Sequence, residues 1–155
     1  MGAVLFYHLT QRPLADTLRT LLEKSLSNGW RVAVRGTDQA ALTQLDEALW
    51  LGPKEGFVPH GLAGGDFDAA QPVLLQTGAE IVNDAMCLMA VQGADVSAQD
   101  ADKCERVCIL FDGHDDAAVA QARVQWKALT GAGVAAQYWS EESGRWEKKA
   151  DSVSG

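Results

Sequence analysis

Three aspartates and a histidine cluster in one short stretch of the chain, at Asp112, His114, Asp115 and Asp116. Carboxylates and imidazoles are the groups with which hydrolytic and phosphoryl-transfer enzymes move protons. The cluster follows an apolar run that predicts a strand, and open α/β sheets bind ligands at the carboxyl ends of their strands. The same acids would also stabilise the N-terminus of a following helix, where unpaired N–H groups favour negative charge. Helix capping is the simpler explanation, and a catalytic site is the alternative.

Aromatic and cationic residues form a second group that could serve a function. Arg123, Trp126 and Lys127 are three and four residues apart, so they share one face of a predicted helix. Arginine and tryptophan are enriched at the energetic centres of protein interfaces. Equally, Trp126 could close the core with the Arg123 guanidinium lying across its ring. Trp50, at the end of another predicted helix and beside a long loop, is typical of an exposed protein–protein anchor.

Metal and nucleotide sites are not expected. A zinc site needs about four closely spaced ligands, whereas the three cysteines (Cys87, Cys104 and Cys108) and the three histidines are scattered. We expect Cys87 and Cys108 to be small core residues. The chain lacks a Walker loop, and the glycines of 131–136 follow a helix and lead into a strand, the reverse of a dinucleotide-binding turn. No cofactor is therefore predicted.

The elements that position these residues follow from hydrophobic periodicity. Apolar runs predict strands at 4–8, 31–35, 73–75, 85–91, 107–111 and 134–139, and amphipathic spacing predicts helices at 13–28, 38–50 and 115–130. Strands that alternate with helices predict a parallel sheet covered on its faces. The expected fold is therefore α/β: one three-layer, mostly parallel domain, Rossmann-like in topology but without a nucleotide-binding loop.

Three segments depart from this pattern. Residues 52–72 contain five glycines and three prolines and exceed an ordinary connection of about 4–6 residues, so they are expected to be functional or disordered. Residues 93–103 are polar and acidic and predict a surface loop. Residues 141–155 are charged and small, which predicts a flexible C-terminal tail beyond a single domain over 1–140.

Composition narrows the classes of function. The chain has 155 residues, 47% hydrophobic and 22% charged, as expected of one globular domain, and its net charge is −8. An acidic protein repels phosphates at long range, which argues against a broad duplex-DNA or anionic-membrane surface but leaves room for a small local site. A single-strand binder that stacks bases on its five tryptophans would need a positive groove. Without a signal peptide or an apolar span, a cytoplasmic location is expected.

Three strings of the sequence carry a family resemblance: LDEALW at 45–50, FVPH at 57–60 and LAG at 62–64. Together with neighbouring residues in order over 4–139, they resemble the chi subunit family of bacterial DNA polymerase III. The resemblance implies a small α/β protein of the clamp-loader assembly with no catalytic activity of its own. It also implies two partners, the psi subunit and the acidic C-terminal tail of single-stranded-DNA-binding protein, so that DNA is contacted only indirectly.

The resemblance assigns the tail-binding residues to the last long helix. Family members use an arginine and an aromatic residue there, which correspond to Arg123 and Trp126, with Lys127 beside them. The chain has Val119 where family members often carry a lysine, one turn before the arginine. With one cation fewer, the affinity for the tail is expected to be modest and sensitive to salt.

The resemblance assigns the psi contact to Trp50, Phe57 and Pro59, with a helicase as a further candidate partner for that face. The alternative hypothesis is a small cytosolic enzyme with its site at the turn over 112–116. An enzyme should have a deep pocket at that turn. An adaptor should instead show shallow apolar patches near Trp50 and Trp126 and no such pocket.

Overall fold

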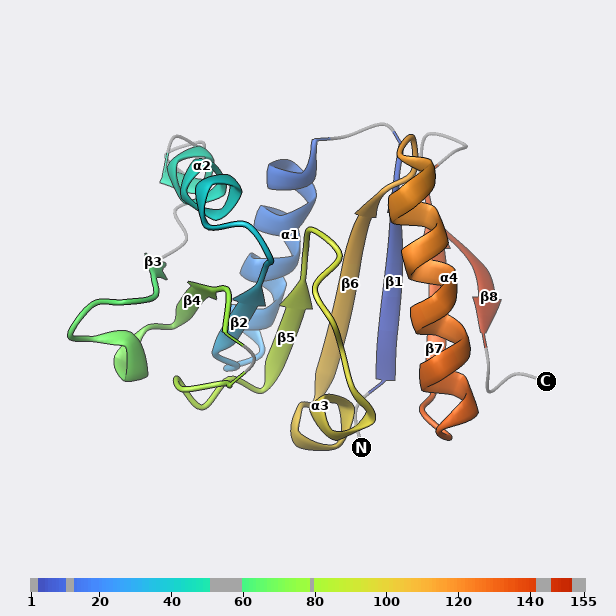
Figure 1. Cartoon of the computed structure of the whole chain (residues 1–155). Coiled ribbons are helices and arrows are strands. Elements are labelled where there is room, and N and C mark those ends of the chain that lie inside the picture. Colours follow the sequence, from blue (N-terminus) through green and yellow to red (C-terminus); the bar gives the residue numbers. More distant parts are fainter. Residues whose placement is uncertain (1–2, 11–12, 51–59, 79, 142–145, 152–155) are drawn as a thin grey trace.

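Eight strands form one mixed, mostly parallel sheet in a computed structural model that describes residues 3–10, 13–50, 60–78, 80–141 and 146–151. The strands are β1 (Ala3–Leu9), β2 (Val32–Arg35), β3 (Gly61–Leu62), β4 (Val73–Gln76), β5 (Cys87–Ala90), β6 (Arg106–Asp112), β7 (Ala136–Ser140) and β8 (Glu147–Asp151). Their order is β3-β4-β2-β5-β6-β1-β7-β8, and the β7–β8 pair is antiparallel. The sheet is shown in Figure 1.

Helices cover both faces of this sheet. They are α1 (Leu14–Ser27), α2 (Gln39–Trp50), α3 (Ala98–Lys103) and α4 (Asp116–Gly131), with a short 3-10 turn, η2 (Asp68–Ala70). Figure 1 shows α4 in front of the sheet and α1 behind it. The predicted three-layer α/β fold is confirmed, and the three predicted helices correspond to α1, α2 and α4.

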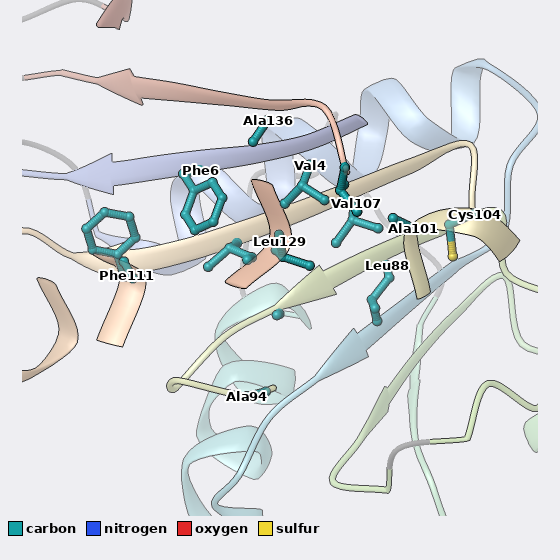
Figure 2. Packing of buried hydrophobic residues seen from close by; sticks show 14 of the residues in the cluster. Val4, Phe6, Leu88, Ala94, Ala101, Cys104, Val107, Phe111, Leu129 and Ala136 are labelled. Carbon is teal, nitrogen blue, oxygen red and sulfur yellow. The ribbon is translucent and has the colours of Figure 1, made fainter. Parts of the chain in front are cut away.

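Each face of the sheet has its own hydrophobic core. On the α4 side, Val4 and Phe6 of β1 pack with Leu129 of α4, as Figure 2 shows. On the other side, Leu18 of α1 and Leu42 of α2 belong to the second core cluster. All four residues of β2, β4 and β5 are buried, which is typical of parallel strands covered on both faces.

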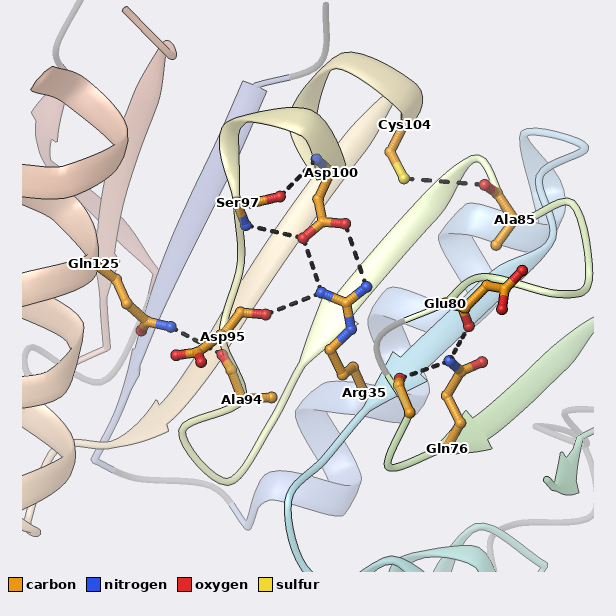
Figure 3. Close-up of polar contacts among 11 residues, drawn as sticks. Arg35, Gln76, Glu80, Ala85, Ala94, Asp95, Ser97, Asp100, Cys104 and Gln125 are labelled. Atoms are coloured by element: carbon orange, nitrogen blue, oxygen red, sulfur yellow. Dashed lines mark hydrogen bonds and ion pairs between the residues drawn. The ribbon is translucent and has the colours of Figure 1, made fainter. Parts of the chain in front are cut away.

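The predicted loop over 93–103 contains the short helix α3, which begins with a capping box. Ser97 accepts a hydrogen bond from the backbone N–H of Asp100, and the Asp100 carboxylate accepts one from the backbone N–H of Ser97. The Arg35 guanidinium binds both carboxylate oxygens of Asp100 and the carbonyl oxygen of Asp95, at 2.8 to 3.3 Å (Figure 3). These bonds attach α3 to the end of β2, which the sequence prediction did not include.

Strand β8 lies inside the segment 141–155 for which the sequence predicts a flexible tail. Residues Glu147–Asp151 pair with β7 instead, and the Trp146 ring contacts the Tyr7 ring edge-on at 5.3 Å. An edge strand needs only backbone partners, so the polar sequence of β8 gave no hydrophobic signal. Its exposed Lys148 and Lys149 are the kind of residue that keeps a free sheet edge from pairing with other chains.

Candidate functional site

Helix α4 is fixed at its N-terminus by the acidic turn that the sequence singled out. The Asp115 carboxylate accepts hydrogen bonds from the backbone N–H groups of Ala117 and Ala118, so Asp115 is the N-cap of the helix. Farther along, the buried Gln125 donates a hydrogen bond to the carbonyl oxygen of Ala94 at 2.9 Å (Figure 3). The register of α4 is thereby set, and with it the face that the helix presents to solvent.

Arg123 and Lys127 lie on that exposed face, one turn apart. Neither side chain has a hydrogen-bond or ion-pair partner among the residues that the structure describes. Val124 beside them is 61% exposed, an unusual fraction for a branched apolar residue. We call Arg123, Val124, Trp126 and Lys127 the α4 surface.

Trp126 stands at the border between the α4 surface and the core. Its ring lies 5.4 Å from that of Phe6 and 6.4 Å from that of Tyr138, and it is partly buried. The structure records no stacking of the Arg123 guanidinium on this indole. Trp126 therefore packs against the core, as one of the two sequence hypotheses states. The Arg123 guanidinium, however, does not lie across the Trp126 ring. The α4 surface combines two exposed cations with an apolar neighbour, a combination that suits a carboxylate next to an apolar group.

Trp50 ends helix α2 and is 50% exposed. Its ring lies over the imidazole of the buried His60, with centroids 4.3 Å apart. His60 Nε2 is in turn 3.1 Å from the carbonyl oxygen and 3.2 Å from a carboxylate oxygen of Asp46, one helical turn before Trp50. The other two predicted psi-contact residues, Phe57 and Pro59, lie outside the described residues.

The contact of His60 with Trp50 and Asp46 is a feature that the sequence hypotheses missed. The three residues belong to the LDEALW and FVPH strings, but nothing in their spacing shows that they meet. Together they fix the Trp50 ring to the body of the protein. A large aromatic ring that is both held in place and half exposed suits an interface anchor.

Comparison with known proteins places these residues in a family. Residues 1–137 match the family model described as DNA polymerase III chi subunit, HolC. The chain belongs to the DNA polymerase III chi subunit family. The matched span of this chi-family chain includes both the α4 surface and Trp50, and it ends within β7. The family resemblance inferred from the sequence is confirmed.

Two curated chi proteins are similar over parts of their length. "DNA polymerase III subunit chi" of Escherichia coli (strain K12) is 51% identical over 37 residues, which cover 24% of this chain and 25% of that protein. "Probable DNA polymerase III subunit chi" of Rickettsia prowazekii (strain Madrid E) is 23% identical over 91 residues, or 59% of this chain and 55% of that protein. The chain thus aligns with about a quarter and about half of the length of these chi relatives.

A cleft of about 670 Å³ opens at the 112–116 turn of this chi-family chain. The enzyme hypothesis predicts a pocket at this turn, and the adaptor hypothesis's prediction of none was wrong. The cleft lies between the starts of α1 and α4, beside the carboxyl ends of β1 and β6. This is the place where a doubly wound sheet reverses its winding and leaves a crevice. The fold alone therefore produces the cleft.

Asp112, His114 and Asp115 at the cleft are already engaged in local structure. Asp112 accepts a hydrogen bond from the backbone N–H of His114, and Asp115 caps α4. His114 Nε2 is 2.9 Å from the carbonyl oxygen of Thr10. Capping and turn formation account for this acidic cluster, as the simpler of the two sequence hypotheses states.

Gly113 in this turn has no room for a side chain, because an added Cβ would overlap the ring of His8. That ring cannot retreat easily, since it stacks on Phe111 at 5.3 Å. We expect Gly113→Ala to lower the free energy of unfolding by about 1–3 kcal/mol, the range for overpacking. Urea denaturation measures the change. Gly131→Ala is the control: it meets open space at the end of α4 and should leave stability unchanged or slightly raised.

The described part of the chi-family chain has two further properties that bear on function. It contains no group of three or more histidine, cysteine or acidic side chains that could hold a metal ion. Among the same residues, none of the helices has the length and apolar character needed to cross a bilayer. Cys87, Cys104 and Cys108 are buried free thiols, and Cys87 accepts a hydrogen bond from the Ser25 hydroxyl at 3.7 Å.

Proposed function

We propose that this chi-family chain is a non-catalytic accessory subunit of bacterial DNA polymerase III. It links the clamp loader, through the psi subunit, to the acidic C-terminal tail of single-stranded-DNA-binding protein during DNA replication in the cytoplasm. The observation that supports the proposal is the pair of exposed cations on α4, Arg123 and Lys127, which lie beside Trp126 and have no ion-pair partner among the described residues. DNA itself is reached through the tail-bearing partner.

The chemistry of the α4 surface fits an acidic tail that ends in an apolar ring and a free carboxylate. The Arg123 guanidinium offers a planar fork with which to bind both oxygens of a carboxylate. Lys127 adds a second positive charge one turn away. The edge of Trp126 and the exposed Val124 supply an apolar wall for the ring. Val119 instead packs on the core and contributes no cation.

The first test of this function is binding of a synthetic acidic peptide that ends in Pro-Phe. We expect Arg123→Ala to weaken binding about tenfold or more, because a charge-assisted hydrogen bond is typically worth about 1.5–3 kcal/mol. Lys127→Ala should weaken it less, since an ammonium group is a hydrated point charge. Trp126→Ala should match the arginine variant by removing the wall. Isothermal titration calorimetry at low and moderate salt measures all three.

Lys148→Ala is the matched control, because Lys148 is an exposed cation on β8 rather than on the α4 surface. It should bind the peptide like the wild type. Affinity should fall as salt is raised, as expected for charges near the surface. If the Arg123 and Trp126 variants both bind like the wild type, α4 is not the tail site and this part of the proposal is wrong.

The psi subunit is assigned to the other site, around Trp50. Phe57 and Pro59 of the FVPH segment would complete that contact, and a helicase is the further candidate for the same face. What supports the assignment is the half-exposed Trp50 ring, held by His60 at the end of α2. Trp50 and the α4 surface lie on different helices, so the two partners could bind at the same time.

A further inference from the structure

A pocket lined by aromatic side chains lies on the α1 side of the sheet and shares no lining residue with the α4 surface or with Trp50. It has a volume of about 620 Å³ and is lined by Tyr7, Thr17, Thr20, Lys24, Trp139 and Trp146, among others. Strands β7 and β8 extend the sheet past β1, and α1 forms the other wall of the pocket. We call this cavity the α1 pocket.

Three aromatic side chains shape the α1 pocket for a flat ring. Tyr7 and Trp139 are neighbours in the β1–β7 register, and the Trp146 ring meets Tyr7 edge-on at 5.3 Å. The Trp139 indole N–H donates a hydrogen bond to Gln137 at 3.1 Å, which holds that ring in place. Both tryptophans are only partly buried, so part of each ring is accessible. Such an arrangement stacks well on another planar ring.

The polar groups of the pocket narrow the choice of ring. Thr17 is 5% exposed, and its hydroxyl has no hydrogen-bond partner among the described residues, a costly state for a buried polar group. Burial raises the pKa of Tyr7 above its ordinary value, so its hydroxyl remains a proton donor. A phenyl or aliphatic group would leave the Thr17 hydroxyl unpaired. A heteroaromatic ring with donors and acceptors on its edge would pair with it.

Charge on the α1 pocket is balanced, unlike that of the chain as a whole. One acid, Asp16, and one cation, Lys24, line it, while the chain carries a net charge of −8. Lys24 also lines an adjoining groove of about 530 Å³ together with Arg106 and Glu23. A phosphate attached to a bound ring would therefore meet two cations and one acid.

We infer that the α1 pocket binds a nucleobase, stacked on Trp139 and Trp146 and hydrogen-bonded by Thr17. The base could belong to a single strand or to a free nucleoside, and the same chemistry serves both. The inference does not depend on the proposed function, because it involves neither the α4 surface nor Trp50.

The test is quenching of tryptophan fluorescence by two probes, free thymidine and a short oligothymidylate. We expect both to quench, and the oligonucleotide to bind more tightly and with greater salt sensitivity if the source is a strand. Trp146→Leu should weaken binding about tenfold, the usual loss of one stacking partner. Thr17→Val keeps the shape of the side chain and should cost about threefold or more. If only thymidine binds, the source is a free nucleoside.

Trp126→Phe is the control, because Trp126 packs in the core on the opposite face of the sheet. It should leave quenching by both probes intact. If Trp146→Leu does not fold, as circular dichroism would show, Thr17→Val decides. The inference is overturned if neither probe quenches, or if the Trp146 and Thr17 variants bind like the wild type. It is also overturned if neither thymidine nor oligothymidylate quenches the fluorescence, but the acidic peptide does so in a way that requires Trp146 and Thr17.

Discussion

Replacing Asp100 with alanine should lower the free energy of unfolding by about 3–5 kcal/mol, the usual cost of removing one partner of a buried ion pair. The Arg35 side chain is 6% exposed, and its guanidinium is bound to both carboxylate oxygens of Asp100. Without that carboxylate, a buried positive charge would lose both of its bonds to Asp100 and would no longer face an opposite charge there. The loss of the capping box with Ser97 adds to the effect.

Urea denaturation measures this loss, and Asp102→Ala is its matched control. Asp102 is an acid on the same short helix, but it is exposed. Its replacement should change stability by about 0.5 kcal/mol or less. Similar values for the two variants would show that the Arg35–Asp100 pair contributes little.

The same ion pair should make stability depend on pH in the acid range. Burial alone would raise the pKa of Asp100, but hydrogen bonds from Arg35 and from the Ser97 backbone outweigh it and hold the pKa below its ordinary value of 3.8. A group with a depressed folded pKa stabilises the protein above its unfolded pKa. That stabilisation is lost as the pH falls through the folded pKa. The difference between wild type and Asp100→Asn should therefore shrink below the ordinary pKa of the carboxyl group.

The second large effect is expected on the psi face. Trp50→Ala should abolish co-purification of the psi subunit, because large aromatic anchors at interface centres dominate binding energy. The ring is half exposed and contributes little to the core, so the variant should fold normally. Pull-down of co-expressed psi, with circular dichroism as the check on folding, measures the result.

Phe67→Ala provides the comparison for Trp50. Phe67 is 72% exposed and precedes η2, outside the proposed psi contact. Its loss should leave psi bound. Retention of psi by Trp50→Ala, or equal losses in both variants, would show that the family assignment does not apply to this face.

Much of the fold could be predicted because hydrophobic spacing reports which faces are buried. The leucines of α1 recur every three or four residues, and Leu18 and Leu22 are indeed fully buried. Helix α3 had a local signal as well, since Ser97 and Asp100 have the spacing of a capping box, but the prediction treated the segment as a loop. Strand β8 had none, because a charged edge strand pairs through its backbone.

The sites were harder to predict because their parts meet only in three dimensions. Spacing correctly put Arg123 and Lys127 on one helix face, but it could not decide whether Arg123 covers Trp126. The partnership of His60 with Trp50 spans a long loop. The α1 pocket joins residues from opposite ends of the chain, Tyr7 and Trp146, and therefore left no local pattern to detect.

The position of β1 has a consequence for synthesis on the ribosome. This first strand lies between β6 and β7, both from the last third of the chain. A nascent chain therefore carries an apolar strand with no native neighbour until β6 has been synthesised. The other half of the sheet, β3-β4-β2-β5, can pair earlier. A chain that stops before β6 therefore leaves β1 exposed to aggregation or to chaperones.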